Sequence, residues 1–250
     1  MKTCVRSVSA STGIPVLADE NLYPAILRML GDVPPAGPVL DVPAGFGAFA
    51  AELAHRGWRD IHCLDIIAPE EFRLESVSYR QHDAARPLPY PDGYFDCVFS
   101  IEGIEHFESP WTFVKELCRV LKPGGRLFIS TPNTFSVDAR LKYLTAGYFP
   151  RFRPLMLEPH NVLHQPVDDA HIAPIYFWQL NFFLMQGGVK IERISTNAYV
   201  RRPQWVKRVF ENLIARMIRN GMRRRGFPDP GVTSDEVLFG DCIILEGKKT

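Results

Sequence analysis

Apolar and polar positions group along the chain into blocks that predict strands and helices in turn. Short apolar runs, typical of buried strands, occupy residues 38–42, 60–66, 77–83, 95–101 and 126–130. Between them, residues 46–56 and 111–121 repeat apolar positions three and four residues apart, as amphipathic helices do. Strands that alternate with helices favour a parallel, doubly wound α/β sheet.

The pattern is weaker at the start of the chain and in its second half. Residues 1–18 have no clear period, so we expect a weakly ordered tail before a helix over residues 19–31. After residue 132 the regular pattern stops. Residues 133–173 are rich in aromatic, proline and histidine residues and predict a long irregular insertion, which in a compact domain is usually functional or disordered.

Regular elements return after the insertion. We expect a helix over residues 175–185, a sixth strand over residues 189–195 and a seventh over residues 236–249, antiparallel and near a sheet edge. The sequence therefore predicts a tail and helix over residues 1–36 and one α/β domain over residues 37–250. The insertion would cover the substrate.

The composition narrows the class of protein. The chain has 250 residues, of which 46% are hydrophobic and 23% charged, as in ordinary globular proteins. Its formal net charge of +1 gives no indication of nucleic-acid binding. The five cysteines are odd in number and form no C-x-x-C pair, which argues against a disulfide framework and a zinc site. We expect a cytoplasmic protein without metal.

The first strand leads into a glycine-rich turn. Gly45, Gly47 and Ala50 form G-x-G-x-x-A, which is typical of turns that bind dinucleotides. However, Asp41 stands at the end of the strand, where a pyrophosphate at the helix N-terminus would meet a negative charge. The turn therefore favours a ligand with positive charge.

Two further acids follow the next two strands. Asp65 comes 65 − 45 = 20 residues after Gly45, a spacing that suits a carboxylate on ribose hydroxyls. Asp83 ends the third strand and would accept from an adenine amino group. Three carboxylates at three strand ends favour S-adenosylmethionine over NAD(P). In the alternative interpretation, Asp41 and Asp83 only cap the turns that follow them.

Four segments, in this order, resemble class I, Rossmann-like S-adenosylmethionine-dependent methyltransferases. They are VLDVPAGFG, CLDI, HDAARPLPYPDGYFDCVFSIEGIEH and KELCRVLKPGGRLFISTPN, and together they span residues 38–133. The usual first motif of the family is D-x-G-x-G-x-G, and here Pro43 replaces the first glycine. The resemblance implies a seven-stranded sheet of order 3-2-1-4-5-7-6, in which strand seven is antiparallel.

The resemblance also implies a set of residues around S-adenosylmethionine. Asp41, Ala44, Gly45 and Gly47 would surround the methionine part, Asp65 the ribose and Asp83 the adenine, and Ser100 and Ile101 would face the cofactor from strand four. Their neighbours Pro43, Ile66 and Ala84 complete the predicted cofactor-binding set.

Histidines indicate a base for the acceptor. Methyl transfer to a hydroxyl of high pKa needs a group that takes the proton. His106 follows strand four, and His160, His164 and His171 lie in the insertion; of these, His106 and His171 are our catalytic candidates. In the alternative interpretation they are structural.

The class of acceptor stays open. Residues 168–180, DDAHIAPIYFWQL, resemble more loosely a stretch of methyltransferases that act on sugars or glycan-linked precursors. We therefore expect a small-molecule, sugar or glycan-precursor hydroxyl, with lipid- and quinone-type acceptors as alternatives. Two other functions remain at this point: an NAD(P)-dependent Rossmann oxidoreductase and a non-catalytic module that binds S-adenosylmethionine.

Residues 201–225 form a basic amphipathic segment between strands six and seven. The segment has nine Arg or Lys and one Glu, a net charge of +8, so the rest of the chain carries 1 − 8 = −7. An apolar stripe at helical spacing runs through Trp205, Val206, Val209, Phe210, Leu213, Ile214, Met217 and Ile218. We favour a helix packed on the sheet over one in peripheral contact with an anionic membrane or acceptor. We expect no nucleic-acid partner, and the sequence leaves the oligomeric state open.

Overall fold

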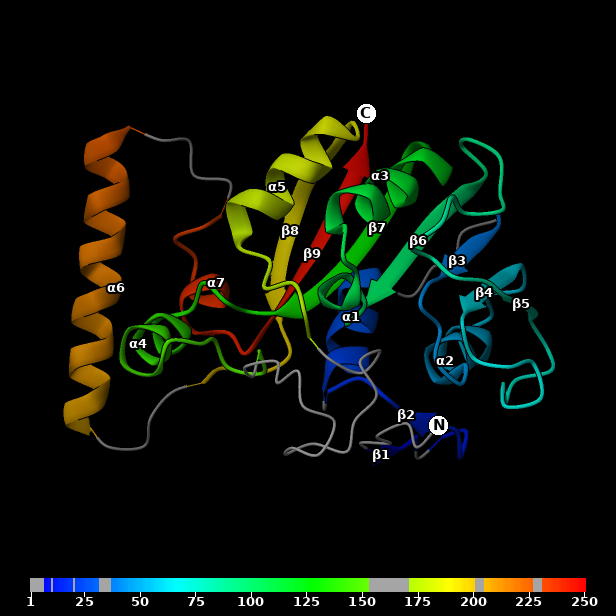
Figure 1. Ribbon diagram of the computed structural model, residues 1–250, viewed down its shortest axis with the longest axis horizontal. Helices are drawn as coiled ribbons and strands as arrows, with labels where there is room; N and C mark the ends of the chain where they lie inside the picture. Colours follow the sequence, from blue (N-terminus) through cyan, green and yellow to red (C-terminus); the bar gives the residue numbers. More distant parts are fainter. Residues whose placement is uncertain are drawn as a thin grey trace.

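A computed structural model of the chain describes residues 7–9, 11–19, 21–31, 37–152, 171–200, 205–226 and 231–250. Its centre is a seven-stranded sheet of order β5-β4-β3-β6-β7-β9-β8 (Figure 1). The strands are β3 (Val39–Asp41), β4 (Ile61–Asp65), β5 (Ser78–Gln81), β6 (Phe95–Ile101), β7 (Leu121–Pro132), β8 (Val189–Thr196) and β9 (Cys242–Lys249).

The topology of this sheet confirms the prediction. Counted along the chain within the sheet, the order is 3-2-1-4-5-7-6, and β9 runs antiparallel to both of its neighbours, β7 and β8. Residues 122–125, between the predicted helix and the predicted fifth strand, form an irregularity inside β7, since Phe95 pairs with Leu121 and Cys97 already pairs with Arg126.

The N-terminal segment is more ordered than predicted. β1 (Ser7–Val8) and β2 (Pro15–Val16) form an antiparallel hairpin, so the expected weak order is wrong for the described residues 7–9 and 11–19. Every second residue from Ile14 to Ala18 is buried against the first helix and its neighbours. The alternation covers only three buried residues, which is too short a stretch for the sequence pattern alone to predict a strand.

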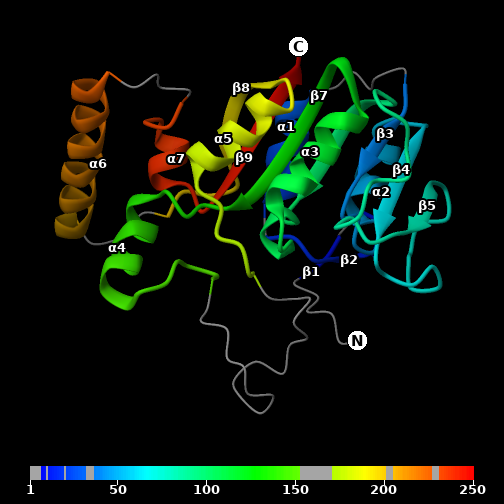
Figure 2. The same ribbon diagram turned by 45° about the horizontal axis from the view of Figure 1, so that its top comes forward.

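Helices cover both faces of the sheet (Figures 1 and 2). α1 (Leu22–Leu30) and α2 (Ala48–His55) bury their apolar residues on one face, and α3 (Pro110–Val120) and α5 (Phe177–Gln186) on the other. Neighbouring residues of a strand point to opposite faces. Accordingly, Val39 lies in the core between the sheet and helices α1 and α2, and Leu40 lies in the core between the sheet and helices α3 and α5. A 3-10 turn, η1 (Ile104–His106), follows β6.

Two short helices occupy places where the sequence predicts none. α4 (Val137–Ala146) lies inside the predicted irregular insertion, and α7 (Asp235–Phe239) takes the first residues of the predicted seventh strand. Caps explain both: Ser136 accepts from the backbone N–H of Ala139, and Ser234 accepts from that of Val237. The strand therefore begins only at Cys242.

The basic segment forms the predicted helix, α6 (Trp205–Arg225), but its predicted packing on the sheet is wrong. Ala215, Ile214 and Ile218 pack against α4 and α7, and α6 stands at the outer edge of the molecule (Figures 1 and 2). The reason is that α1 and α5 already cover the two faces of the sheet at β8 and β9. None of the helices in the described ranges combines the length and apolarity needed to cross a bilayer.

Candidate active site

The predicted site residues gather at the carboxyl ends of β3, β4 and β6. The chain leaves β3 toward β4 on one side and returns to β6 on the other side, so the strand order reverses here. Ligands of open α/β sheets bind at such a reversal.

The glycine turn after β3 depends on two backbone conformations that disfavour a side chain. Gly45 has φ 55° and Gly47 has φ 93°. A Cβ on Gly47 would lie 2.8 Å from the Phe72 ring. The N–H of Gly45 donates to Oδ2 of Asp65 at 2.7 Å, which ties the turn to the end of β4.

Pro43 and Ala44 connect the turn to the rest of the sheet. The peptide bond between Val42 and Pro43 is cis. The Pro43 ring lies so close to Gly103, just after β6, that a Cβ there would be 2.4 Å from Pro43 Cδ. The N–H of Ala44 donates to the carbonyl of Leu64 at 2.9 Å, and the Ala44 methyl is buried in the core. Pro43 therefore packs the turn against the loop that carries His106.

Asp41 is a buried carboxylate at the centre of this edge. It is 1% exposed, and its Oδ2 meets no hydrogen-bond donor within the described part of the chain. Burial, and then the charge of Asp65, raise the pKa of Asp41 well above its usual value. A ligand that brings a positive charge or a donor would stabilise this carboxylate.

Asp65 is buried as well, but its oxygens are engaged. Oδ2 accepts from Gly45 and Oδ1 accepts from the N–H of Ile67 at 3.2 Å. Burial raises the pKa of Asp65, while these backbone hydrogen bonds lower it. Ile66 beside it is exposed. A ribose would meet the remaining lone pairs of Asp65, so its role on the ribose stays a prediction.

Asp83 is exposed and caps its own turn. Its Oδ1 accepts from the N–H of Ala85 at 2.9 Å, and its Oδ2 lies 3.6 Å from Nε of Arg86. This is the alternative geometry that the sequence allowed, although it leaves further lone pairs for an adenine amino group. The side chain of Ala84 is buried in the core, so only its backbone would face a ligand.

Ser100 and Ile101 end β6 and are both buried. The Ser100 Oγ makes no hydrogen bond to the described residues and lies 3.5 Å from the Cβ position of Gly103. Two polar atoms, Asp41 Oδ2 and Ser100 Oγ, are thus buried without partners near the glycine turn. These orphaned atoms fit the donors and the positive charge of S-adenosylmethionine.

His106 and His171, our two catalytic candidates, are far apart in the sequence and meet in space. Their ring centroids are 4.8 Å apart and the rings are nearly perpendicular. The carbonyl of Glu105 accepts from the N–H groups of Ile172 and Ala173, both at 3.0 Å, which fixes His171 beside the end of β6. His160 and His164 lie outside the described residues.

Glu105 turns the histidine pair into a trio. One ligand atom from each of Glu105, His106 and His171 lies within 4.8 Å of the others, and Glu105 is fully buried. In such a trio the carboxylate and one imidazole can orient the other imidazole as a base. One carboxylate and two imidazoles are also a donor set that suits a divalent cation. The expected absence of a metal therefore stays a prediction.

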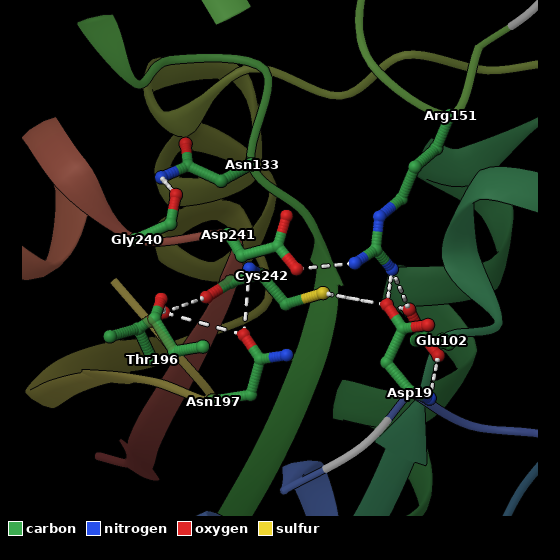
Figure 3. A network of polar contacts seen from close by, with 10 residues as sticks. Asp19, Glu102, Asn133, Arg151, Thr196, Asn197, Gly240, Asp241 and Cys242 are labelled. Atoms are coloured by element: carbon green, nitrogen blue, oxygen red, sulfur yellow. Dashed lines mark hydrogen bonds and ion pairs between the residues drawn. The ribbon is translucent and has the colours of Figure 1, made fainter. Parts of the chain in front are cut away.

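Sequence reasoning missed a network centred on Arg151. The guanidinium bridges three carboxylates, those of Asp19, Glu102 and Asp241, with Nη1 at 3.1 Å from Oε1 of Glu102 (Figure 3). These acids precede α1, follow β6 and precede β9. Arg151 thus ties the part of the insertion after α4 to the edge of the site. Arg151 stands in the aromatic stretch YFPRFRP with a second arginine two residues later, and nothing in that pattern indicates ion pairs with three distant acids.

The segment before α1 and the loop after β6 are also joined directly, because the N–H of Asp19 donates to Oε2 of Glu102 at 2.7 Å. Cys242 lies against the same two acids, and burial raises the pKa of its thiol. The four described cysteines, Cys63, Cys97, Cys118 and Cys242, are free thiols.

Known proteins resemble this chain in sequence and in fold. A family profile described as a methyltransferase domain matches residues 40–129. The ubiquinone biosynthesis O-methyltransferase of Xanthomonas oryzae pv. oryzae (strain PXO99A) is 34% identical over 125 residues, 46% of this chain and 52% of that protein. The chain thus spans about half the length of the first curated relatives that it matches.

A longer match comes from Xanthomonas axonopodis pv. citri (strain 306), whose protein of the same name is 30% identical over 175 residues, 66% of this chain and 68% of that protein. Among solved structures, a SAM-dependent methyltransferase from Archaeoglobus fulgidus has the same fold, with a TM-score of 0.56 and 17% identity over 89% of this chain and 90% of that one. Together with the acidic strand ends and the glycine turn, these matches show that the chain belongs to the class I S-adenosylmethionine-dependent methyltransferases.

Proposed function

We propose that this protein transfers the methyl group of S-adenosylmethionine to a hydroxyl of a small-molecule acceptor and releases S-adenosylhomocysteine. The observation that carries the proposal is the pair of His106 and His171 at the end of β6, beside the glycine turn. The names of the curated relatives, which are O-methyltransferases, support an oxygen acceptor.

The cofactor would be held by the strand ends. Asp41, Gly45 and Gly47 would surround its methionine part, Asp65 its ribose and Asp83 its adenine. When bound, S-adenosylmethionine supplies a methyl group that its sulfonium has already made electrophilic. The buried carboxylate of Asp41 favours a cationic ligand over a pyrophosphate, so the NAD(P) alternative requires a ligand of the wrong charge.

His106 would act on the acceptor. Its neutral imidazole takes the hydroxyl proton while the new C–O bond forms and the bond from the methyl carbon to sulfur breaks. His171 would fix the orientation of the His106 ring through their edge-to-face contact, and the backbone of Glu105 would fix His171. His106 is thus the catalytic residue in this proposal, and His171 is a positioning residue.

Arg151 would close the site from the insertion. Because it pairs with Glu102 after β6, it holds residues 151–152 next to the loop that bears His106. Phe152 also contacts the ring of His171, with centroids 5.5 Å apart. Exclusion of water and alignment of the two reactants are the main contributions that a protein makes to methyl transfer.

The acceptor is best sought in two classes. Phenols of the quinone-precursor type follow from the names of the relatives, and sugars or glycan precursors follow from the looser resemblance of residues 168–180. Assays of S-adenosylhomocysteine release against both classes would identify the acceptor. The sequence also leaves open a peripheral membrane contact of residues 201–225. The outer surface of α6, which lies away from the active site, supports such a contact.

The test is single-turnover methylation by His106→Ala and His171→Ala, with His55→Ala on the exposed side of α2 as the control. We expect His106→Ala to slow the chemical step by about 10²–10⁴-fold while cofactor affinity is kept. We expect His171→Ala to have a smaller effect that changes the pH profile of the rate. Unchanged rates in both variants would remove the histidine base, and cofactor binding without turnover of any acceptor would favour the non-catalytic alternative.

A metal would show itself in the same assay. If the trio acts through histidine alone, incubation with EDTA leaves the rate unchanged. Loss of activity that an added transition-metal ion such as Zn²⁺ or Fe²⁺ restores would instead assign Glu105, His106 and His171 to a cation.

A further inference from the structure

The outer side of α6 carries an apolar ridge that no described part of the chain covers. We define the outer ridge as Val209, Phe210, Leu213 and Met217, which are 59%, 52%, 53% and 65% exposed. Val209 and Phe210 are adjacent, and Leu213 and Met217 follow at spacings of three and four residues, so all four lie on one side of the helix. Trp205, 76% exposed, lies at the N-terminal end of the same helix.

The fold does not need this ridge. The opposite side of α6, with Ala215 and the half-buried Ile214 and Ile218, already packs against α4 and α7. Nε of Arg219 donates to the carbonyl of Thr233 and its Nη2 to Asp235, which fix the same inner side. The helix is therefore apolar on two sides, and only the inner side contributes to the described core.

A flank of arginines runs beside the outer ridge. Arg208, Arg216 and Arg223 are all exposed. At 100° per residue they fall on one side of the ridge, together with the exposed Asn212. The described helix holds seven Arg or Lys and a single acid, Glu211, which is buried on the inner side. The outer surface of α6 is thus apolar and cationic at once.

An outer surface that is both apolar and cationic favours one kind of partner over the others. A second copy of the chain would bring its own arginine flank against the first, and like charges repel. An anionic bilayer offers both an apolar layer for the ridge and negative headgroups for the arginines. We propose that α6 lies in the plane of an anionic membrane surface, with the outer ridge inserted and Arg208, Arg216 and Arg223 at the headgroups.

The position of α6 suits this role. The helix is 21 residues long, about 31 Å at 1.5 Å per residue, and it stands outside α4 and α7 (Figures 1 and 2). A flat surface can therefore reach its outer side without disturbing the sheet. The membrane contact does not depend on methyl transfer, because the outer ridge shares no residue with the candidate active site.

Vesicle flotation of the full chain tests the proposal. The vesicles would contain phosphatidylcholine alone or phosphatidylcholine with about one third phosphatidylglycerol. We expect binding to the anionic vesicles that weakens with salt, since surface charges are screened. Replacing Arg208, Arg216 and Arg223 together by Gln should lower the partition coefficient about a hundredfold, on the order of fivefold for each arginine.

A second variant isolates the ridge. Leu213→Ser with Met217→Ser should lower the partition coefficient at least about tenfold. The matched control, Val8→Ser with Met185→Ser, removes two exposed apolar side chains from β1 and α5 and should leave binding unchanged. Tryptophan emission should shift to shorter wavelength with anionic vesicles, and Trp205→Phe should abolish that shift. Circular dichroism and Tm confirm that each variant is folded.

Three results would overturn the proposal: no binding of the wild-type chain to anionic vesicles, equal binding by the ridge variant, or a stable dimer by light scattering that the ridge variant dissociates. Turnover of a soluble acceptor is measured in parallel. Full turnover without vesicle binding refutes only the membrane proposal, and vesicle binding without any turnover refutes only the proposed function.

Discussion

Asp41→Asn should stabilise the free protein and weaken cofactor binding at the same time. The side chain is 1% exposed, its Oδ2 has no partner in the described residues, and Asp65 adds a second negative charge nearby. An amide keeps the shape of the carboxylate and removes its charge. The free protein therefore no longer bears the cost of a buried charge, while the complex loses the charge that attracts a cationic cofactor.

The size and the pH dependence follow from the burial. An unpaired buried polar group costs about 1–3 kcal/mol and a charged one costs more, so the amide removes the part of the penalty that the charge adds. We therefore expect the free energy of unfolding to rise by about 2 kcal/mol, which is roughly 4–8 °C in Tm for a chain of this size. The folded state raises the pKa of Asp41 above its ordinary value of 3.8. It therefore holds this proton more tightly than the unfolded chain does, and wild-type stability falls as the pH rises above that value.

The gain in stability should thus be absent near about pH 4, where wild-type Asp41 is protonated, and larger near about pH 8. Urea unfolding at both pH values measures it, and calorimetry with S-adenosylmethionine should show an affinity loss of about tenfold to a hundredfold. Glu75→Gln removes an exposed carboxylate and is the control. If Asp41→Asn destabilises the free protein at both pH values, Asp41 has a structural partner and our account of the turn is wrong.

Two further substitutions test the surroundings of the site. Gly103→Ala places a Cβ 2.4 Å from Pro43, so it should displace the glycine turn and lower cofactor affinity about tenfold or more; Gly221→Ala in α6, measured by the same calorimetry, should not. Arg151→Gln leaves three partly buried carboxylates without their cation and should lower the free energy of unfolding by about 2 kcal/mol. Adding Asp19→Asn to Arg151→Gln should recover part of that loss in urea unfolding, and no recovery would show that the acids do not repel one another.

Most of the sheet could be predicted because its central strands β3, β4, β6 and β9 are buried on both faces. Runs such as Phe95–Ile101 are nearly continuous in apolar residues, which is typical of central parallel strands, and the acids that end β3 and β4 mark the carboxyl edge. Helices α3 and α5 were predictable for a related reason, since each buries one apolar side on the sheet. In these elements the local pattern and the packing agree.

The short helices could not be predicted from the same kind of pattern. In α4 only Val137 and Ala139 are buried, so the helix has almost no apolar period. Its signals are the cap at Ser136 and the left-handed Gly147, and both are common in turns as well. An apolar run near α7 suggested a strand, whereas the cap at Ser234 decides for a helix.

The site was predictable in part, because its residues differ in how they reach it. Acids at strand ends are placed by the sheet itself, so the position of Asp41 follows from the topology. The meeting of His106 with His171 depends on the path of the insertion, and the sequence fixes only that both are available. The Arg151 network joins segments before α1, after β6, after α4 and before β9, and no local pattern records such a meeting.

The helix α6 shows where a hydrophobic pattern stops being informative. Its period predicts a helix with an apolar side, but the pattern does not say what covers that side. A place on the sheet would have required an open face at β8 and β9, and α1 and α5 occupy both faces there. The inner side of α6 therefore packs only on α4 and α7, and the outer ridge remains exposed beside its arginines. An apolar surface of this kind, which contributes nothing to the described core, is explained more simply by a partner outside the chain than by folding.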